Sequence, residues 1–216
     1  SEFASAAPRS WQVFEVHPTP SGPRPIHYFV PPACHAMRCP LLVGGDLIGS
    51  GMVADHLYHM IEAGEIRPVI VASIAPNFAR RAQEYRPPAD DDEGAIKAYD
   101  AHIQIFDGFV SESLSRYDVD QESIFAFGFS NSAEFALTYT ARRPDLIAGA
   151  IAVSPPDTFE AEIAEYWAGP ADNSSIFHGS WEQVDYPALE AIGVEVQSLP
   201  GGHAKGVAAL ALSTRF

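Results

Sequence analysis

The sequence is poor in basic residues, with 13 Lys and Arg against 28 Asp and Glu, which gives a formal net charge of −15. Nucleic acids and anionic membranes are bound by clustered cations, so this balance argues against both as partners. No apolar run approaches the roughly 20 residues that a membrane-spanning helix needs. We therefore expect a soluble protein, cytoplasmic rather than secreted.

Cysteine is also scarce, and the two residues present, Cys34 and Cys39, lie close together in the chain. We expect two unpaired thiols just before a strand, while a small-loop disulfide, which would suit an oxidising compartment, is the main alternative. A metal site would need more ligands nearby than His35 alone. The histidines do not cluster at the spacing of metal ligands elsewhere either, so the sequence implies no metal and no cofactor.

The rest of the composition is ordinary for a globular protein, with 47% hydrophobic and 19% charged residues in 216. A chain of this length most simply forms one domain, and we expect residues 1–10 to be a tag or leader remnant and residues 11–216 to be the domain. Strand-like and helix-like patterns alternate along it. Extended segments are expected at 11–16, 26–30, 41–43, 67–76, 123–130, 147–155, 174–180 and 194–200, around a Pro/Gly turn region at 17–25. Helices are expected at 53–64, 95–116, 132–143, 159–169, 185–192 and 204–212.

This alternation predicts an α/β fold, with a mostly parallel twisted sheet and helices on both of its faces. In such folds chemistry gathers at the carboxyl ends of the strands. One strand end there reads Gly128-Phe129-Ser130-Asn131-Ser132 and runs directly into a helix. Small residues on both sides of a serine allow a tight strand-to-helix turn that would expose Ser130 as a nucleophile. An ordinary helix N-cap is the alternative role for this serine.

A nucleophilic serine needs a base, and the base needs a carboxylate that orients it. His203 follows a late strand in a glycine-rich loop before the last expected helix, where such a fold would place the base. Glu182 follows the preceding strand and is our first choice for the acid, with Asp185 as the alternative. The order Ser130, Glu182, His203 is the order serine, acid, histidine of the α/β-hydrolases.

An acyl-transfer site also needs two N–H donors for the oxyanion. We expect one from the main chain of Asn131, and the other from the main chain of Asp46, with Gly45 and Leu47 as alternatives. The glycines around residue 46 permit backbone shapes that expose an amide.

The substrate pocket is expected to be open, because the segment from Pro155 to Ser174 is too short for a large independent cap. Phe129, Trp181 and Tyr85 are candidate pocket walls that contact the substrate. Each of these aromatic side chains could equally belong to the core.

The sequence resembles the esterase family of α/β-hydrolases that includes enterochelin esterases, S-formylglutathione hydrolases and feruloyl-type esterases. The stretches that carry the resemblance lie in order along the chain: LLVGGDLIGSGMVADHLYHMIEAGEIRPVIVASIAP, RRAQEYRPP, IFAFGFSNSAEFALTYTARRPDLIAGAIAVSPP and LPGGHAKGVAALAL. The sequence departs from the family pattern at three positions, having Gly44 in place of Asp, Ser132 in place of Gly and Glu182 in place of Asp. The loop residues Glu84 and Tyr85 are typical of the family near the site.

The resemblance implies an α/β-hydrolase fold and a serine esterase that cleaves a carboxylic ester or thioester through an acyl-enzyme on Ser130, His203 and Glu182. Its partner would be a small-molecule ester, and it would need no cofactor. An acyltransferase that uses the same site is one alternative. A noncatalytic binding protein that retains the fold is another. Whether the protein is a monomer or a homo-oligomer is left open by the sequence.

Overall fold

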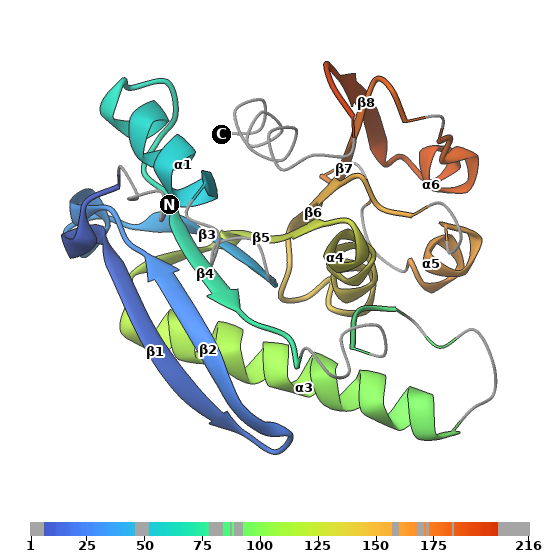
Figure 1. Ribbon diagram of the computed structural model, residues 1–216, viewed down its shortest axis with the longest axis horizontal. Coiled ribbons are helices and arrows are strands. Elements are labelled where there is room, and N and C mark those ends of the chain that lie inside the picture. Colours follow the sequence, from blue (N-terminus) through green and yellow to red (C-terminus); the bar gives the residue numbers. More distant parts are fainter. Residues whose placement is uncertain are drawn as a thin grey trace.

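The computed structural model describes residues 7–45, 52–77, 84–86, 88, 93–156, 160–167, 171, 173–182 and 184–202. Within these residues the strands form an eight-stranded sheet in the order β1-β2-β4-β3-β5-β6-β7-β8 (Figure 1). The strands are β1 (Gln12–Thr19), β2 (Gly22–Phe29), β3 (Cys39–Gly45), β4 (Ile70–Ile74), β5 (Val119–Phe129), β6 (Gly149–Val153), β7 (Ser175–Gly179) and β8 (Glu195–Leu199).

The sheet is parallel from β4 to β8 and antiparallel only where β1 and β2 join it. The strands β3, β4 and β6 are buried along their whole length, as expected for strands covered on both faces. The expected mostly parallel sheet is confirmed.

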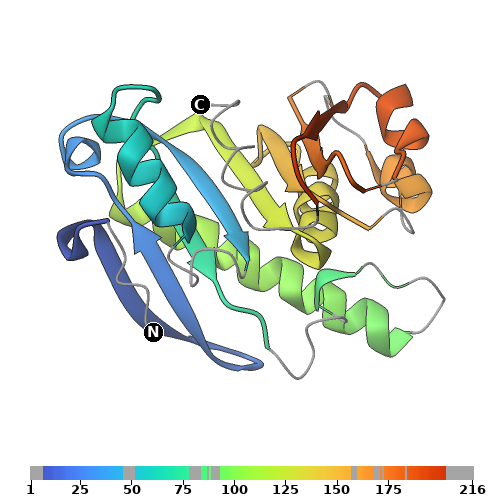
Figure 2. The same cartoon turned by 45° about the horizontal axis from the view of Figure 1, so that its top comes forward.

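Helices cover both faces of the sheet (Figures 1 and 2). They are α1 (Met52–Glu62), α3 (Glu93–Arg116), α4 (Asn131–Arg142), α5 (Glu160–Tyr166) and α6 (Pro187–Ala191), with short 3₁₀ turns η1 (Arg9–Trp11) and η2 (Pro32–His35). On one face, α1 packs through Leu57 and Met60 on a cluster that includes Leu42. The other face carries α3 and α4, whose Phe106 and Phe135 pack on the side of Leu41. Neighbouring residues of β3 therefore contribute to opposite cores, as a period of two requires.

The hairpin of β1 and β2 is longer than the sequence predicts. The expected turn region, 17–25, is mostly strand, and the turn itself lies between Thr19 and Gly22. Pro23 and Pro25 are tolerated there because β4 pairs with β2 only from Ile26 onward. In the two-stranded part a missing N–H on the outer side of the strand removes no ladder hydrogen bond.

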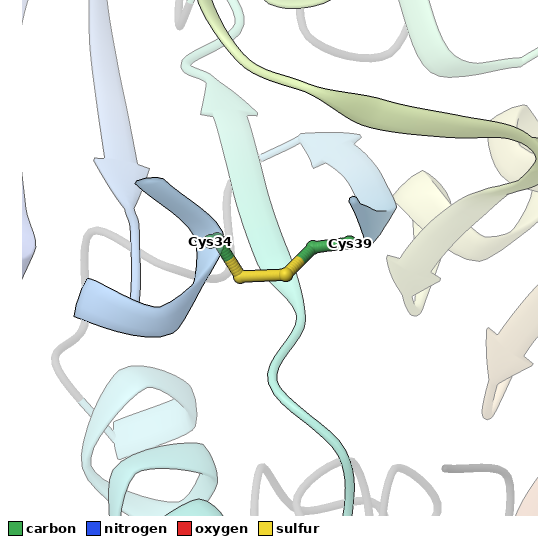
Figure 3. The surroundings of a disulfide bond; sticks show 2 residues. All are labelled: Cys34 and Cys39. Atoms are coloured by element: carbon green, nitrogen blue, oxygen red, sulfur yellow. A yellow bond between two sulfur atoms is a disulfide. The ribbon is translucent and has the colours of Figure 1, made fainter. Parts of the chain in front are cut away.

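Cys34 and Cys39 form a disulfide, which joins η2 to the first residue of β3 (Figure 3). The expectation of two unpaired thiols is therefore wrong, and both residues are buried. The 3₁₀ turn brings the two Cα atoms within 5.6 Å, a separation that a disulfide can bridge. Disulfides persist mainly in oxidising compartments, so this bond argues against the cytoplasmic expectation.

Ala7 packs against the domain ahead of the boundary expected at residue 11. Its side chain is buried beside α1, and its N–H donates to Asp55 at 2.9 Å.

Among the described residues, no helix has the length and hydropathy of a membrane span. Those residues also hold no group of three or more His, Cys, Asp or Glu side chains that could bind a metal ion.

Candidate active site

The carboxyl ends of the parallel strands bring several polar residues to one edge of the sheet. Ser130 follows β5, Ser154 follows β6 and Glu182 lies in the turn after β7. Neighbouring strands are about 4.8 Å apart, so the ends of β5 and β7 are separated by about 10 Å. An imidazole that bridges a serine and a carboxylate fits that span.

Ser130 has the backbone conformation of a nucleophile at a sharp strand-to-helix turn. Its φ of 57° and ψ of −128° are unusual for a residue with a Cβ. Its side chain makes no capping hydrogen bond to α4, so the N-cap alternative does not describe this serine. The backbone is fixed on both sides, because the Ser130 N–H donates to the Val153 carbonyl and its own carbonyl accepts from Ala133, each at 2.8 Å.

The turn is closed by the two small residues that flank Ser130. A Cβ on Gly128 would overlap the Ser132 carbonyl, so only glycine fits where strand and helix approach. Ser132 stands where the nucleophile-elbow motif G-x-S-x-G has its second glycine, and it is buried. Its Oγ accepts from the Phe129 N–H at 2.9 Å and donates to the Phe129 carbonyl at 2.8 Å. The serine in place of glycine therefore adds two hydrogen bonds that stabilise the turn.

Glu182 is held at the end of β7 by two donors to one oxygen. Its Oε2 accepts from the Gly179 N–H at 2.5 Å and from the Ser154 Oγ at 2.7 Å. Asp185, the alternative acid, is exposed. The geometry favours Glu182 over Asp185 as the acid.

His203 and Asp46 lie outside the described residues, so their assignments stay predictions. The described chain ends at Gly202, one residue before His203, in the segment after β8 that lies against the turn with Glu182. A Cβ on Gly179 would lie 2.7 Å from the Gly202 Cα, and the Trp181 N–H donates to the Gly201 carbonyl at 2.9 Å.

Asn131, the expected oxyanion donor, begins α4 directly after Ser130. The first N–H groups of a helix have no partner within the helix and lie at the positive end of its dipole. The second expected donor follows β3, which ends at Gly45. The Tyr85 hydroxyl occupies the space that a Cβ on Gly45 would need.

The three expected pocket residues differ in exposure. Trp181 is 82% exposed beside Glu182, and Phe129 is half-buried next to Ser130. Tyr85 is fully buried and packs on the rings of His102 and Phe135. This gives Tyr85 a place in the core below the site, and its contact with substrate stays a prediction that its burial does not support.

The loop around Tyr85 is anchored by a buried ion pair that the sequence did not reveal. Arg24 of β2 donates to both carboxylate oxygens of Glu84, at 2.9 and 2.5 Å, and the Asn77 N–H donates to Oε2. Burial alone would raise the pKa of Glu84, but Arg24 and Asn77 outweigh it and lower that pKa. His102 lies 3.7 Å from the same carboxylate, and burial lowers its pKa to about 4.

Arg86 connects this loop to the helix of the nucleophile. Its guanidinium donates to Asn131 Oδ1 at 3.3 Å and lies 3.6 Å from Oε2 of Glu134. Glu134 is completely buried in the first turn of α4, and burial raises its pKa to about 7 despite Arg86. Burial therefore moves the pKa of a carboxyl group in the first turn after Ser130 up towards neutral pH.

Solved structures show which known proteins share this fold. An enterochelin esterase from Shigella flexneri superposes with a TM-score of 0.76 at 14% identity, covering 98% of this chain and 60% of its own. The BES protein from Bacillus cereus gives a TM-score of 0.71 at 12% identity over 100% and 98% of the two chains. A ferulic acid esterase gives 0.68 at 17% identity over 94% of each chain. Neither family models nor curated protein sequences match this chain. The chain thus has the α/β-hydrolase fold of these esterases.

Proposed function

We propose that this protein is a serine esterase that hydrolyses a carboxylic ester through an acyl-enzyme on Ser130. The observation that carries the proposal is the strained turn at Ser130, which leaves the side chain uncommitted to helix capping. Such strain persists where function requires it, because it costs about 1–3 kcal/mol. The named esterases among the structural neighbours support the same reaction class.

In the proposed mechanism, the Ser130 Oγ attacks the carbonyl carbon of the ester while His203 accepts its proton. Glu182 orients the imidazole and stabilises the imidazolium that forms. The main-chain N–H groups of Asn131 and Asp46 hold the oxyanion. His203 then protonates the leaving alcohol, and water, activated by the same histidine, releases the acid.

The acyl group is proposed to be aromatic. Trp181 offers a flat, exposed ring beside the acid of the triad. Aromatic rings stack on one another with a gain of about 0.5–1.5 kcal/mol beyond the area they bury. Two of the structural neighbours are named as ferulic acid esterases, and ferulic acid is an aromatic acid.

The test compares Ser130→Ala with the wild type and with Ser123→Ala, a serine near the opposite end of the same strand. Hydrolysis of p-nitrophenyl acetate and of methyl ferulate should fall by about 10⁴-fold in Ser130→Ala and stay unchanged in Ser123→Ala. A fluorophosphonate probe should label the wild type and the control, and leave Ser130→Ala unlabelled. Full hydrolysis by folded Ser130→Ala would disprove the proposal. A wild type that neither hydrolyses nor labels would indicate the noncatalytic alternative.

A further inference from the structure

Ser154 occupies an unusual position at the end of β6. It is the first residue after the strand, its φ is 47°, and it is buried. Its N–H donates to the Phe177 carbonyl of β7 at 2.7 Å, which fixes the backbone in this conformation. A left-handed backbone is costly for a residue with a Cβ, so a glycine would be expected here unless the side chain were needed.

The side chain of Ser154 contacts the proposed acid of the triad. The Ser154 Oγ donates to Oε2 of Glu182 at 2.7 Å, and the Gly179 N–H donates to the same oxygen. A carboxylate with one oxygen held by two donors keeps a fixed orientation, which an imidazole N–H requires from its orienting acid.

The backbone next to Ser154 also contacts the nucleophile. Val153 precedes Ser154, and its carbonyl accepts the N–H of Ser130 at 2.8 Å. The end of β6 thus holds the turn of the nucleophile through one residue and the acid through the next. Both contacts depend on the same short stretch of backbone.

We propose that Ser154 is a positioning residue of the active site, which fixes the carboxylate of Glu182 through its Oε2 atom. This inference rests on the proposed function. Ser154 contacts no reacting atom and acts through Glu182. Its hydroxyl is the reason that a strained backbone carries serine at this point.

The experiment is a double-mutant cycle with Ser154→Ala, Glu182→Ala and the combined variant, scored as kcat and KM on p-nitrophenyl acetate. Ser154→Ala should lower kcat by about tenfold to a hundredfold and leave KM unchanged, since a hydrogen bond to a charged group is lost. In the Glu182→Ala background the same substitution should have no further effect on kcat, because its target is gone.

Two further variants separate positioning from stability. Ser154→Gly removes the hydroxyl and suits the positive φ, so it should fold and show the same loss of kcat. Ser174→Ala is the matched control, because Ser174 is a buried serine beside the other end of β6, where it accepts the Ala150 N–H at 3.0 Å. It should lower stability and leave kcat unchanged.

The outcomes distinguish the two proposals. If Glu182→Ala loses activity while Ser154→Ala and Ser154→Gly keep the wild-type kcat, Ser154 has no positioning role and the esterase proposal stands. An equal loss from Ser154→Ala in both backgrounds overturns the inference in the same way. If Glu182→Ala keeps the wild-type kcat, the acid is assigned wrongly and the inference on Ser154 falls, while the esterase proposal is decided by Ser130→Ala.

Discussion

Ser130 and Ser154 are the residues other than glycine that have a positive φ in the described part of the chain, and they follow the neighbouring strands β5 and β6. The Ser130 N–H binds the carbonyl of Val153, directly before Ser154. A hydrogen bond therefore joins one strained residue to the residue directly before the other. Both lie at the carboxyl edge of the sheet, where active sites of such folds are found.

The strain at Ser130 predicts a difference between two inactive variants. Ser130→Gly removes the Cβ that makes this backbone costly, while Ser130→Ala keeps it. We expect the glycine variant to have the higher free energy of unfolding, by about 1 kcal/mol. Urea denaturation followed by circular dichroism measures it. Equal stabilities for the two variants would mean that the turn is not strained.

Replacing Glu134 by an uncharged residue is predicted to stabilise the protein more at high pH than at low pH. Burial raises its pKa to about 7, so the folded protein binds this proton more tightly than the unfolded chain does. The stability from this group is complete at pH values below its unfolded pKa and is lost as the pH rises through about 7. The free energy of unfolding of Glu134→Gln, measured relative to that of the wild type, should therefore be about 2 kcal/mol higher at pH 8 than at pH 5.

Urea titrations of the wild type and Glu134→Gln at both pH values give this difference. His102, whose pKa burial lowers to about 4, contributes the opposite slope between about pH 4 and 6.5. Because His102 is present in both proteins, its contribution cancels. A variant that gains no stability at pH 8 relative to pH 5 would show that Glu134 is ionised in the folded protein.

Because Arg24 and Glu84 form a buried ion pair, the stability costs of replacing each of them should not add in the double variant. Arg24→Met leaves the Glu84 carboxylate buried without its cation and should cost about 3–5 kcal/mol of folding stability. Arg24→Met combined with Glu84→Leu removes both charges and should cost less than Arg24→Met alone. Thermal or urea unfolding of four proteins, the wild type, Arg24→Met, Glu84→Leu and the double variant, tests this. Costs that simply add would mean that the two side chains do not interact.

The disulfide predicts a modest stabilisation, because it closes a short loop. Replacing Cys34 and Cys39 by alanine should lower the free energy of unfolding by about 2 kcal/mol, on the loop-entropy relation. The urea midpoint of the double variant against the wild type measures it. Maleimide should label unfolded wild type only after reduction. Labelling of both cysteines without reductant would show that the bond does not form.

Much of the fold was predictable because the hydrophobic periods of its elements are clear. The helix expected at 95–116 is α3 (Glu93–Arg116), and the strand expected at 123–130 lies within β5 except for its last residue. The prolines of β2 concealed a strand, because sequence alone does not show which strand faces lack a partner. The disulfide was given second place because thiol pairing depends on backbone geometry that a short spacing does not define.

Ser130 and Glu182 were predicted as site residues where motif and strand end coincide, and the structure places both at the carboxyl edge of the sheet. Ser154 was missed, since a serine at the end of a buried strand carries no sequence pattern, and only its φ and its bond to Glu182 single it out. Tyr85 was expected at the pocket but lies in the core. An aromatic residue in a polar loop gives no sign of which way its ring turns.

At the end of β3, the Tyr85 hydroxyl fills the space that a Cβ on residue 45 would occupy. In homologous chains these two positions should therefore covary, with a larger residue at one accompanied by a smaller residue at the other. Such compensation would let the strand end move slightly while the core below it stayed filled.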